Sequence, residues 1–114
     1  MLEINLEFVR GMLFVRLDGV LDNNTYTKLS DCLDSMIHEK GLKYFVVNLE
    51  NLEYIDELGL QVIIDRYFDV VLHDGKLVIC GYNDQFKQNL NITDTFKKIE
   101  STNNELGALK LINI

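Results

Sequence analysis

The sequence predicts an α/β fold, with a mixed sheet of four or five strands, an N-terminal β-hairpin and helices packed on the sheet. Two patterns carry this prediction. Apolar and polar residues alternate near the N-terminus, and short apolar runs farther along are separated by segments with helical spacing. The expected order is β-β-α-β-α-β-α, with room for one more strand and helix and with right-handed crossovers. Because 114 residues suit one core and no linker or repeat interrupts them, residues 1–114 are expected to form one domain.

The first element is a hairpin. Apolar residues occupy every second position from Leu2 to Phe8 and again from Leu13 to Leu17, which is typical of half-buried strands. Between the two runs, Arg10 and Gly11 fit a tight turn, so the two strands should pair antiparallel.

A loop rich in turn formers, residues 19–24, leads into the first helix. Asp22 or Asn24 is expected to cap that helix. The helix should end near Lys40 and Gly41, where a cation precedes a residue suited to a left-handed C-cap. Its apolar face consists of Tyr26, Leu29, Leu33, Met36 and Ile37.

The nearly continuous apolar run 44–49 predicts a strand covered on both faces, and residues 51–56 are expected to form a loop. A second helix follows over about 58–73. Its buried stripe should consist of Leu60, Ile63, Ile64, Tyr67, Val71 and Leu72. Val62 and Val70 fall off that stripe, so either a neighbouring element packs on them or they contact a partner.

The C-terminal third starts with a buried strand over 76–81. Asn83 is expected to cap a short helix that holds Phe86 and Leu90, and residues 93–102 fit either a helical turn or a short edge strand. The last element, 105–111, should be an amphipathic helix. Its apolar residues are Leu106, Leu109 and Leu111.

Composition argues against several classes of function. The net charge of −7 disfavours nucleic acid as a partner, because duplex binding requires Lys and Arg to neutralise phosphates. A basic surface on a partner protein fits the sign better. No apolar run approaches the roughly 20 residues that a membrane helix needs, and the first residues lack the pattern of a signal peptide. We therefore expect a cytoplasmic protein that does not insert directly into a membrane.

Enzymatic patterns are also missing from the sequence. It contains no zinc-protease, nucleophile-elbow or phosphate-loop motif, so we expect no catalytic residue, no cofactor and no metal site. Cys32 and Cys80 each lie in an apolar segment without CxxC spacing, which favours buried, inert thiols. His38 and His73 each fall late in a predicted helix, where a cation is favourable, so structural or exposed histidines are the favoured interpretation.

The most informative stretch is the start of the second helix. An apolar run ends in Asp56 and Glu57, and Leu58 and Gly59 follow. Asp56 is expected to accept a hydrogen bond from the backbone N–H of Leu58 or Gly59, and Glu57 should add about 0.3–1 kcal/mol through the helix dipole. Open α/β sheets keep their functional surfaces at such junctions of a strand and a helix.

Several segments agree with one known family in residues and in spacing. They are the strand 45–49 with 52–56 and Gly59 after it, the element 19–22, and the segments 65–67 and 75–77. In these segments, which span nearly the whole chain, the sequence resembles the STAS domain and most closely the bacterial anti-sigma factor antagonists. The resemblance implies a single STAS-like α/β domain.

The resemblance also implies one half of a partner switch. In this family the unphosphorylated antagonist binds an anti-sigma factor, a serine kinase of the histidine-kinase-like ATPase fold, and so frees a sigma factor to direct transcription. The kinase ends the complex by phosphorylating a Ser or Thr directly after the motif Asp, here Asp56. In this sequence Glu57 stands there and Leu58 follows, so neither can form a phosphoester. Phosphoserine carries about −1.5 to −2 charges against −1 for Glu, so Glu57 is a partial, permanent mimic of the phosphorylated state.

Three hypotheses follow. In the first, the chain is a divergent antagonist that docks on a basic groove of the kinase, and Glu57 fixes it in one state: either the groove accepts the acid, or the protein is locked off and needs another control. Its docking residues would be Asp22, Asn24, Asp56, Glu57, Leu58, Gly59 and Gln61. In the second, it is a non-switching STAS interaction module of a sensory complex or a membrane-transporter assembly, with Leu58, Val62 and Val70 as contacts. In the third, it is a flavodoxin-like domain that binds a small molecule or nucleotide. Unprotected edge strands also leave a homodimer open.

Overall fold

The computed structural model describes residues 1–82 and 94–112. Within them, a five-stranded sheet has the order β1-β2-β3-β4-β5. β1 (Leu2–Val9) runs antiparallel to β2 (Met12–Leu21), whereas β3 (Tyr44–Ile55), β4 (Lys76–Cys80) and β5 (Ser101–Thr102) each run parallel to the strand before them. The predicted mixed sheet with an N-terminal hairpin is confirmed, and its fifth strand is present.

The β1–β2 turn has the backbone that a two-residue hairpin needs. Arg10 and Gly11 both have positive φ, at 53° and 84°. Turns with positive φ at both central residues match the right-handed twist of the flanking strands. Pairing therefore runs without interruption from Val9 and Met12 at the turn to the other end of β1.

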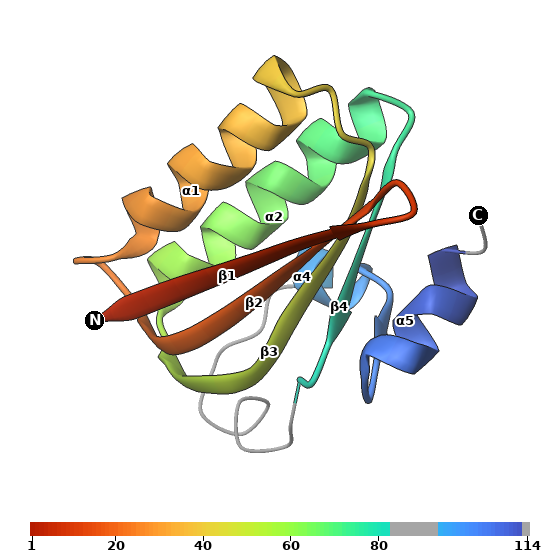
Figure 1. The fold of residues 1–114 in the computed structure, drawn as a ribbon. Helices are drawn as coiled ribbons and strands as arrows, with labels where there is room; N and C mark the ends of the chain where they lie inside the picture. Colours follow the sequence, from red (N-terminus) through yellow and green to blue (C-terminus); the bar gives the residue numbers. More distant parts are fainter. Residues whose placement is uncertain (83–93, 113–114) are drawn as a thin grey trace.

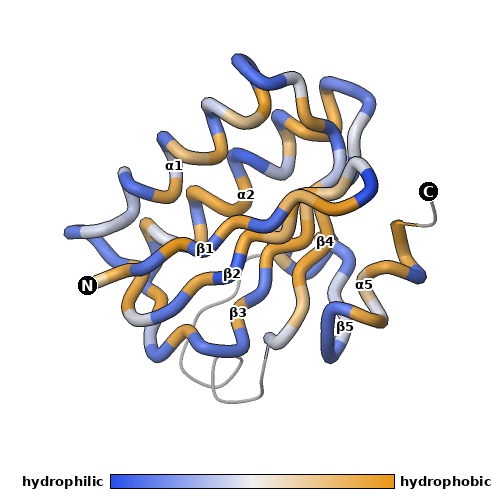
Figure 2. Tube along the Cα trace, in the orientation of Figure 1, coloured by the Kyte–Doolittle hydropathy of each residue, from blue (hydrophilic) through white to orange (hydrophobic). Residues whose placement is uncertain are grey.

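Helices cover the two faces of the sheet unequally (Figure 1). On one face α1 (Tyr26–Asp34), continued by the π-helical segment η1 (Ser35–Glu39), lies beside α2 (Glu57–Leu72). The short helix α4 (Asp94–Lys97) adds Phe96 to the same layer. α5 (Glu105–Ile112) lies on the opposite face. Figure 2 shows hydrophilic and hydrophobic positions alternating along α1 and α2, as expected of helices that bury one side.

The main core lies between the sheet and the layer of α1 and α2. Among its largest fully buried side chains are Leu17, Leu21, Leu29, Leu33, Phe45 and Ile63. A smaller cluster lies under α5 and consists of Met12, Phe14, Val46, Val78, Cys80, Ala108 and Ile112. The apolar face predicted for the first helix is confirmed, since Leu29, Leu33 and Ile37 are buried.

Two predictions in the middle of the chain are wrong. Residues 51–55 were expected in a loop, but β3 continues to Ile55 because β2 keeps pairing with it, with register shifts after Arg16 and Gly19. The stripe of α2 is also displaced near its end. Val70 is buried, whereas Val71 and Leu72 are exposed. The helix ends there in the turn into β4, where the Gly75 N–H donates to the carbonyl of Val70 at 2.8 Å.

The C-terminal elements differ from prediction in a similar way. Both alternatives for residues 93–102 occur, since α4 is followed by the short strand β5. On α5, Ala108 and Ile112 are buried, while Leu106 and Leu109 are exposed. Ala108 and Ile112 are four residues apart and share the face of α5 that packs on the sheet, whereas Leu106 and Leu109 lie off that face. The helix expected after Asn83 lies outside the described residues.

Candidate docking surface at the starts of α1 and α2

The ends of β2 and β3 bring two connecting segments together. These strands are parallel, and their last paired residues are Leu21 and Ile55. The loop 22–25 leads from β2 into α1, and Asp56 leads from β3 directly into α2. Both helix starts therefore lie at the same edge of the sheet (Figure 1).

Asp56 joins the two segments. Its Oδ1 accepts a hydrogen bond from the N–H of Gly59 and its Oδ2 accepts one from the N–H of Asn23, both at 2.9 Å. Its own N–H donates to the carbonyl of Leu21 at 3.1 Å. The predicted cap on Gly59 is confirmed, and Asp56 is the N-cap of α2. The bond from Asn23 additionally fixes the loop 22–25 to the start of α2.

The expectation that Asp22 or Asn24 caps the first helix is wrong. The N-cap is Thr25, and it makes no capping bond with its side chain. Asp22 instead closes a turn before the helix, because its Oδ1 accepts from the N–H of Asn24 and its own N–H donates to Thr25 Oγ1, both at 2.9 Å. Such local bonds to the backbone are characteristic of Asp in turns.

Gly59 lies beneath this surface, where α2 meets the two strand ends. A Cβ at this position would lie 2.7 Å from Cγ of Leu21 and 2.9 Å from Cγ1 of Ile55, closer than side chains pack. Gly59 is buried, so it positions the start of α2 and presents no side chain to a partner.

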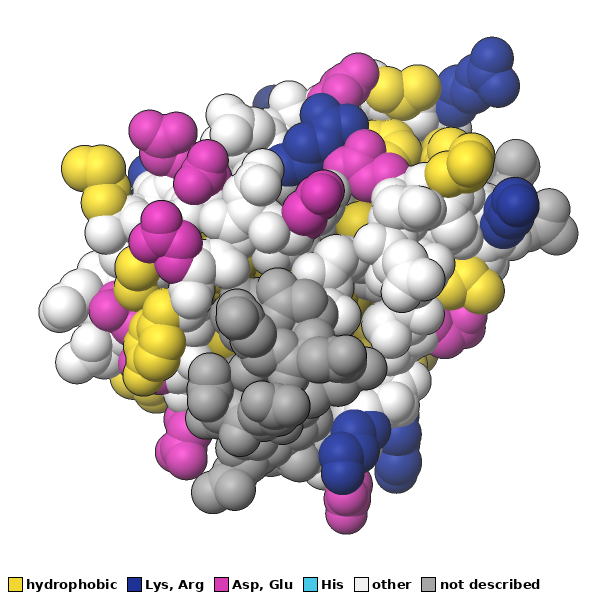
Figure 3. Space-filling view, turned by 90° about the horizontal axis from the view of Figure 1, so that it is seen from below, with side chains coloured by type: hydrophobic (Ala, Val, Ile, Leu, Met, Phe, Trp, Pro, Cys, Tyr) yellow, Lys and Arg dark blue, Asp and Glu magenta, His cyan; other side chains and the backbone are white. Residues whose placement is uncertain are grey.

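The remaining predicted residues form the exposed part of the junction. Asn24, Glu57, Leu58 and Gln61 are all exposed. Tyr54, two residues before Asp56, was not among the predicted docking residues, although its side chain is 53% exposed. Figure 3 shows acidic and hydrophobic side chains gathered together on one side of the lower face of the molecule. Carboxylates interspersed with apolar side chains suit a protein partner that offers basic and apolar groups.

A second polar cluster lies on the face that α5 covers. Arg16 donates from Nε and Nη2 to the two carboxylate oxygens of Glu105, at 2.7 and 2.8 Å, and from Nη1 to Glu7 at 2.7 Å. The hydrogen bonds from Arg16 and from Asn48 hold the pKa of the Glu105 carboxyl below its usual value. Arg16 also lines an open hollow beside Glu50. Since its guanidinium is engaged by two carboxylates, it is poorly placed to bind the phosphates of a nucleotide.

Both cysteines are free. Cys80 is buried as predicted, and burial raises the pKa of its thiol to about 11. Cys32 is half-buried, and burial raises its pKa as well. Both thiols are therefore protonated and unreactive near neutral pH.

Comparison with known families decides the family of the chain. The model of the STAS domain matches residues 3–108. The chain belongs to the STAS domain family. This STAS domain is 32% identical over 113 residues to the anti-sigma F factor antagonist of Paenibacillus polymyxa. The matched region covers 99% of this chain and 97% of that protein. It is also 32% identical over 79 residues to the anti-sigma-B factor antagonist of Staphylococcus aureus, covering 69% of this chain and 72% of that one.

Solved structures share the fold of this STAS domain at low sequence identity. An anti-sigma factor antagonist from Mycobacterium paratuberculosis matches with a TM-score of 0.86 at 16% identity, covering 100% of this chain and 96% of that chain. Unphosphorylated SpoIIAA matches with a TM-score of 0.71 at 19% identity, covering 97% and 98%. The predicted STAS fold is thus confirmed. Of the helices in residues 1–82 and 94–112, none has the length and apolar character needed to span a membrane.

Proposed function

We propose that this STAS domain is an anti-sigma factor antagonist, which binds an anti-sigma factor and so takes part in a partner switch that regulates transcription. The observation that carries the proposal is the 32% identity to the anti-sigma F factor antagonist over nearly the whole of both chains. The construction of the junction supports it, because a backbone fixed by Asp56 presents acidic and apolar side chains to solvent.

The proposed partner is a serine kinase of the histidine-kinase-like ATPase fold. Negative charge from Asp22 and Glu57 would attract a basic groove on it, while Tyr54 and Leu58 would supply apolar contact area. The other proposed docking residues are Asn24, Asp56 and Gln61, with Gly59 beneath them. In this proposal residues 1–114 act as one cytoplasmic domain that catalyses no reaction itself.

Glu57 has a specific part in the proposal. It stands where the family carries its phosphoacceptor, and it has no hydroxyl group to accept phosphate. The surface therefore keeps one charge state, in which Glu57 carries −1, less than the about −1.5 to −2 of a phosphoserine. The proposed partner has a groove that accepts this single charge; in the alternative, the acid keeps the protein permanently unbound. Regulation of the complex would then have to act through something other than phosphate at this position.

A binding experiment tests both statements. Affinity capture from the native cell supplies the partner, and Kd is measured with and without ATP for wild type, Glu57→Ser and Glu39→Ala. We expect the affinity of the wild type for its partner to be the same with and without ATP. Glu57→Ser should be phosphorylated when ATP is present, and it should then bind about tenfold or more weakly than it does without ATP. Glu39 lies in η1, at the far end of the same helix layer, so Glu39→Ala should behave like wild type.

Two outcomes would contradict different parts of the proposal. Capture that recovers no anti-sigma factor would contradict the function. ATP-dependent phosphate on the wild-type protein at Thr25, Thr27 or Ser30 would instead preserve the function and show that the acceptor had moved into α1 or the loop before it.

A second candidate function is a non-switching interaction module in a sensory complex or a membrane-transporter assembly. Exposed apolar residues on the outer side of α2 favour it, since Phe68 and Leu72 are 49% and 78% exposed. Val62 and Val70, which the sequence suggested as contacts, are buried and do not belong to that surface. A stable complex with a partner that is not an ATPase, unaffected by ATP, would support this alternative.

A homodimer is a further candidate arrangement. Among the strands of residues 1–82 and 94–112, β1 pairs with β2 alone, so it is an edge strand of this sheet, and it exposes Leu6 and Phe8. Light scattering over a range of protein concentrations would measure the mass, and a monomer mass throughout would exclude the homodimer.

A further inference from the structure

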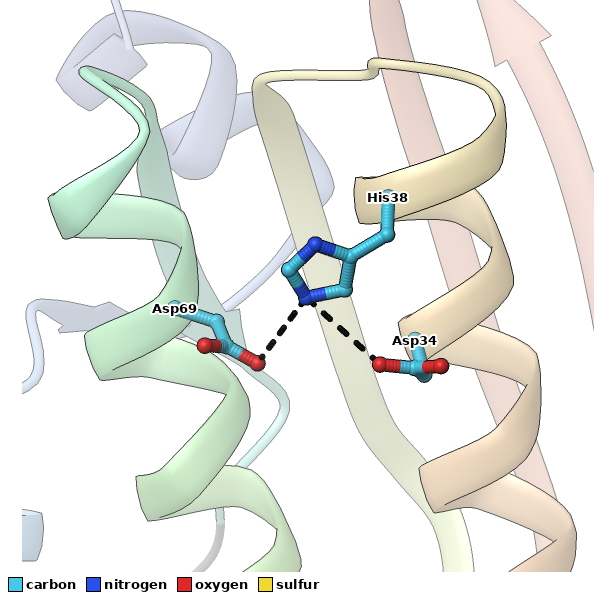
Figure 4. Close-up of side chains that lie close together, drawn as sticks. All are labelled: Asp34, His38 and Asp69. Atoms are coloured by element: carbon cyan, nitrogen blue, oxygen red, sulfur yellow. Dashed lines mark ion pairs between the residues drawn. The ribbon is translucent and has the colours of Figure 1, made fainter.

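Three side chains converge at the end of α1 and α2 that lies away from the docking surface (Figure 4). Asp34 is the last residue of α1, His38 lies in η1, and Asp69 lies in the last turn of α2. Nε2 of His38 lies 3.5 Å from Oδ1 of Asp34 and 3.6 Å from Oδ2 of Asp69. All three atoms are within 4.8 Å of one another.

These distances are longer than hydrogen bonds; they are those of ion pairs, and they also fit ligands around a metal ion. A hydrogen bond from an imidazole N–H to a carboxylate oxygen is about 2.7–3.2 Å long. Zinc binds imidazole nitrogen and carboxylate oxygen at about 2.0–2.2 Å, so a tetrahedral arrangement separates neighbouring ligand atoms by about 3.4 Å. Figure 4 shows the imidazole directing Nε2 between the two carboxylates.

We propose that Asp34, His38 and Asp69 bind a divalent transition-metal ion of the zinc type, which joins the C-terminal ends of α1 and α2. Imidazole together with carboxylate suits zinc and its neighbours in the periodic table, whereas Mg²⁺ prefers oxygen ligands alone. Three protein ligands leave a fourth position for water. The ligand side chains are between 26% and 56% exposed, so an ion can reach them from solvent.

One feature around His38 supports the assignment: Lys40 N–H donates an i→i+5 bond to the Ser35 carbonyl at 3.1 Å, and π-helical turns of this kind are frequent at functional sites. A neighbouring histidine, His73, lies outside the proposed ligand set, with its ring edge-on to that of His38 and the centroids 5.0 Å apart. His73 is itself held in place, because its Nδ1 donates to the carbonyl of Asp69 at 2.8 Å.

Arg66 is the competing cation at this site. Its Nη1 lies 3.0 Å from Oδ1 of Asp34 and 3.0 Å from Oδ2 of Asp69, the same two oxygens that would bind the ion. Binding of the ion therefore requires the guanidinium of Arg66 to move away from these two oxygens. Because the positive charge of Arg66 repels a dication, removal of Arg66 should strengthen metal binding. The motif-based expectation of no metal site missed this cluster, because its ligands come from two different helices.

Isothermal titration calorimetry of tag-free protein with zinc chloride at neutral pH tests the proposal. We expect one ion per chain and no comparable binding of Mg²⁺. His38→Gln should weaken zinc binding about tenfold or more, and Arg66→Gln should strengthen it several-fold. His73→Gln is the matched control, a neighbouring histidine outside the ligand set, and should keep one ion with affinity within about threefold of wild type. Cobalt, used as an absorbance probe, should give a tetrahedral spectrum in wild type and lose it in His38→Gln.

Equal zinc binding by wild type and His38→Gln would overturn the proposal. Loss of the site in His73→Gln to the same degree as in His38→Gln would overturn the ligand assignment. The outcome does not bear on the proposed function, since Asp69 lies about 18 Å along α2 from Glu57, at 1.5 Å per residue. A rise in the unfolding temperature with zinc, present in wild type and absent in His38→Gln, would show that the ion stabilises the folded state.

Discussion

Replacing Asp56 by Ala should destabilise the protein, because this side chain holds both segments of the docking surface. Loss of the capping bond to the Gly59 N–H costs about 0.5–2 kcal/mol. The bond from the Asn23 N–H contributes less than a buried bond would, since that donor is exposed and water can replace the carboxylate. Together these losses should lower the free energy of unfolding by about 2 kcal/mol.

Urea unfolding at neutral pH, followed by far-UV circular dichroism, measures this change. With a slope of about 1–3 kcal/mol per molar urea, the midpoint should fall by about 1 M. Asp56→Asn keeps one side-chain oxygen as an acceptor, so it should lose about half as much. A midpoint for Asp56→Ala within about 0.2 M of wild type, at an unchanged slope, would refute the double role of Asp56.

Two further substitutions and one labelling experiment test other parts of the structure. Gly59→Ala should lower the thermal unfolding midpoint although Ala favours helix by about 1 kcal/mol, because crowding against Leu21 costs about 1–3 kcal/mol; a higher midpoint would show that α2 does not pack so closely. Arg16 lowers the pKa of Glu105 in the folded state. The ionised Glu105 therefore stabilises the folded protein above its ordinary pKa of 4.5, and this stabilisation is lost as the pH falls through the folded-state pKa. The stability difference between wild type and Glu105→Gln should therefore shrink between pH 7 and pH 3 in urea unfolding, and a constant difference would contradict the ion pair. Iodoacetamide at pH 8 should label Cys80 only after unfolding, since burial raises its pKa to about 11, and rapid labelling of Cys80 in the native protein, located by peptide mass spectrometry and distinguished from label on half-buried Cys32, would be inconsistent with its burial.

Local patterns predicted much of the fold. The alternation from Leu2 to Phe8 and the turn at Arg10 and Gly11 depend on neighbours in sequence, and the hairpin formed as expected. The end of β3 depends instead on β2, a distant segment, so its polar residues resembled a loop until the pairing was known. On α5, small Ala108 is buried and larger Leu106 is exposed, because the rotation of the helix against the sheet decides which residues face the core.

The same division applies to the sites. The cap from Asp56 to Gly59 spans three residues and was predicted, whereas the bond from Asn23 to Asp56 depends on two strands ending together. His38 and Asp69 meet only because α1 and α2 lie side by side, a contact for which the sequence has no fixed spacing.

The double hydrogen bond of Asp56 has a consequence for the speed of recognition. The loop 22–25 and the first turn of α2 are ordered before a partner arrives, so association loses little conformational entropy there. Relatives in which an Asp makes the same two hydrogen bonds should associate with their partners at similar rates and differ mainly in how fast their complexes dissociate. Exchange of the residue at Glu57 then alters the charge presented to the partner and leaves the shape of the surface as it was.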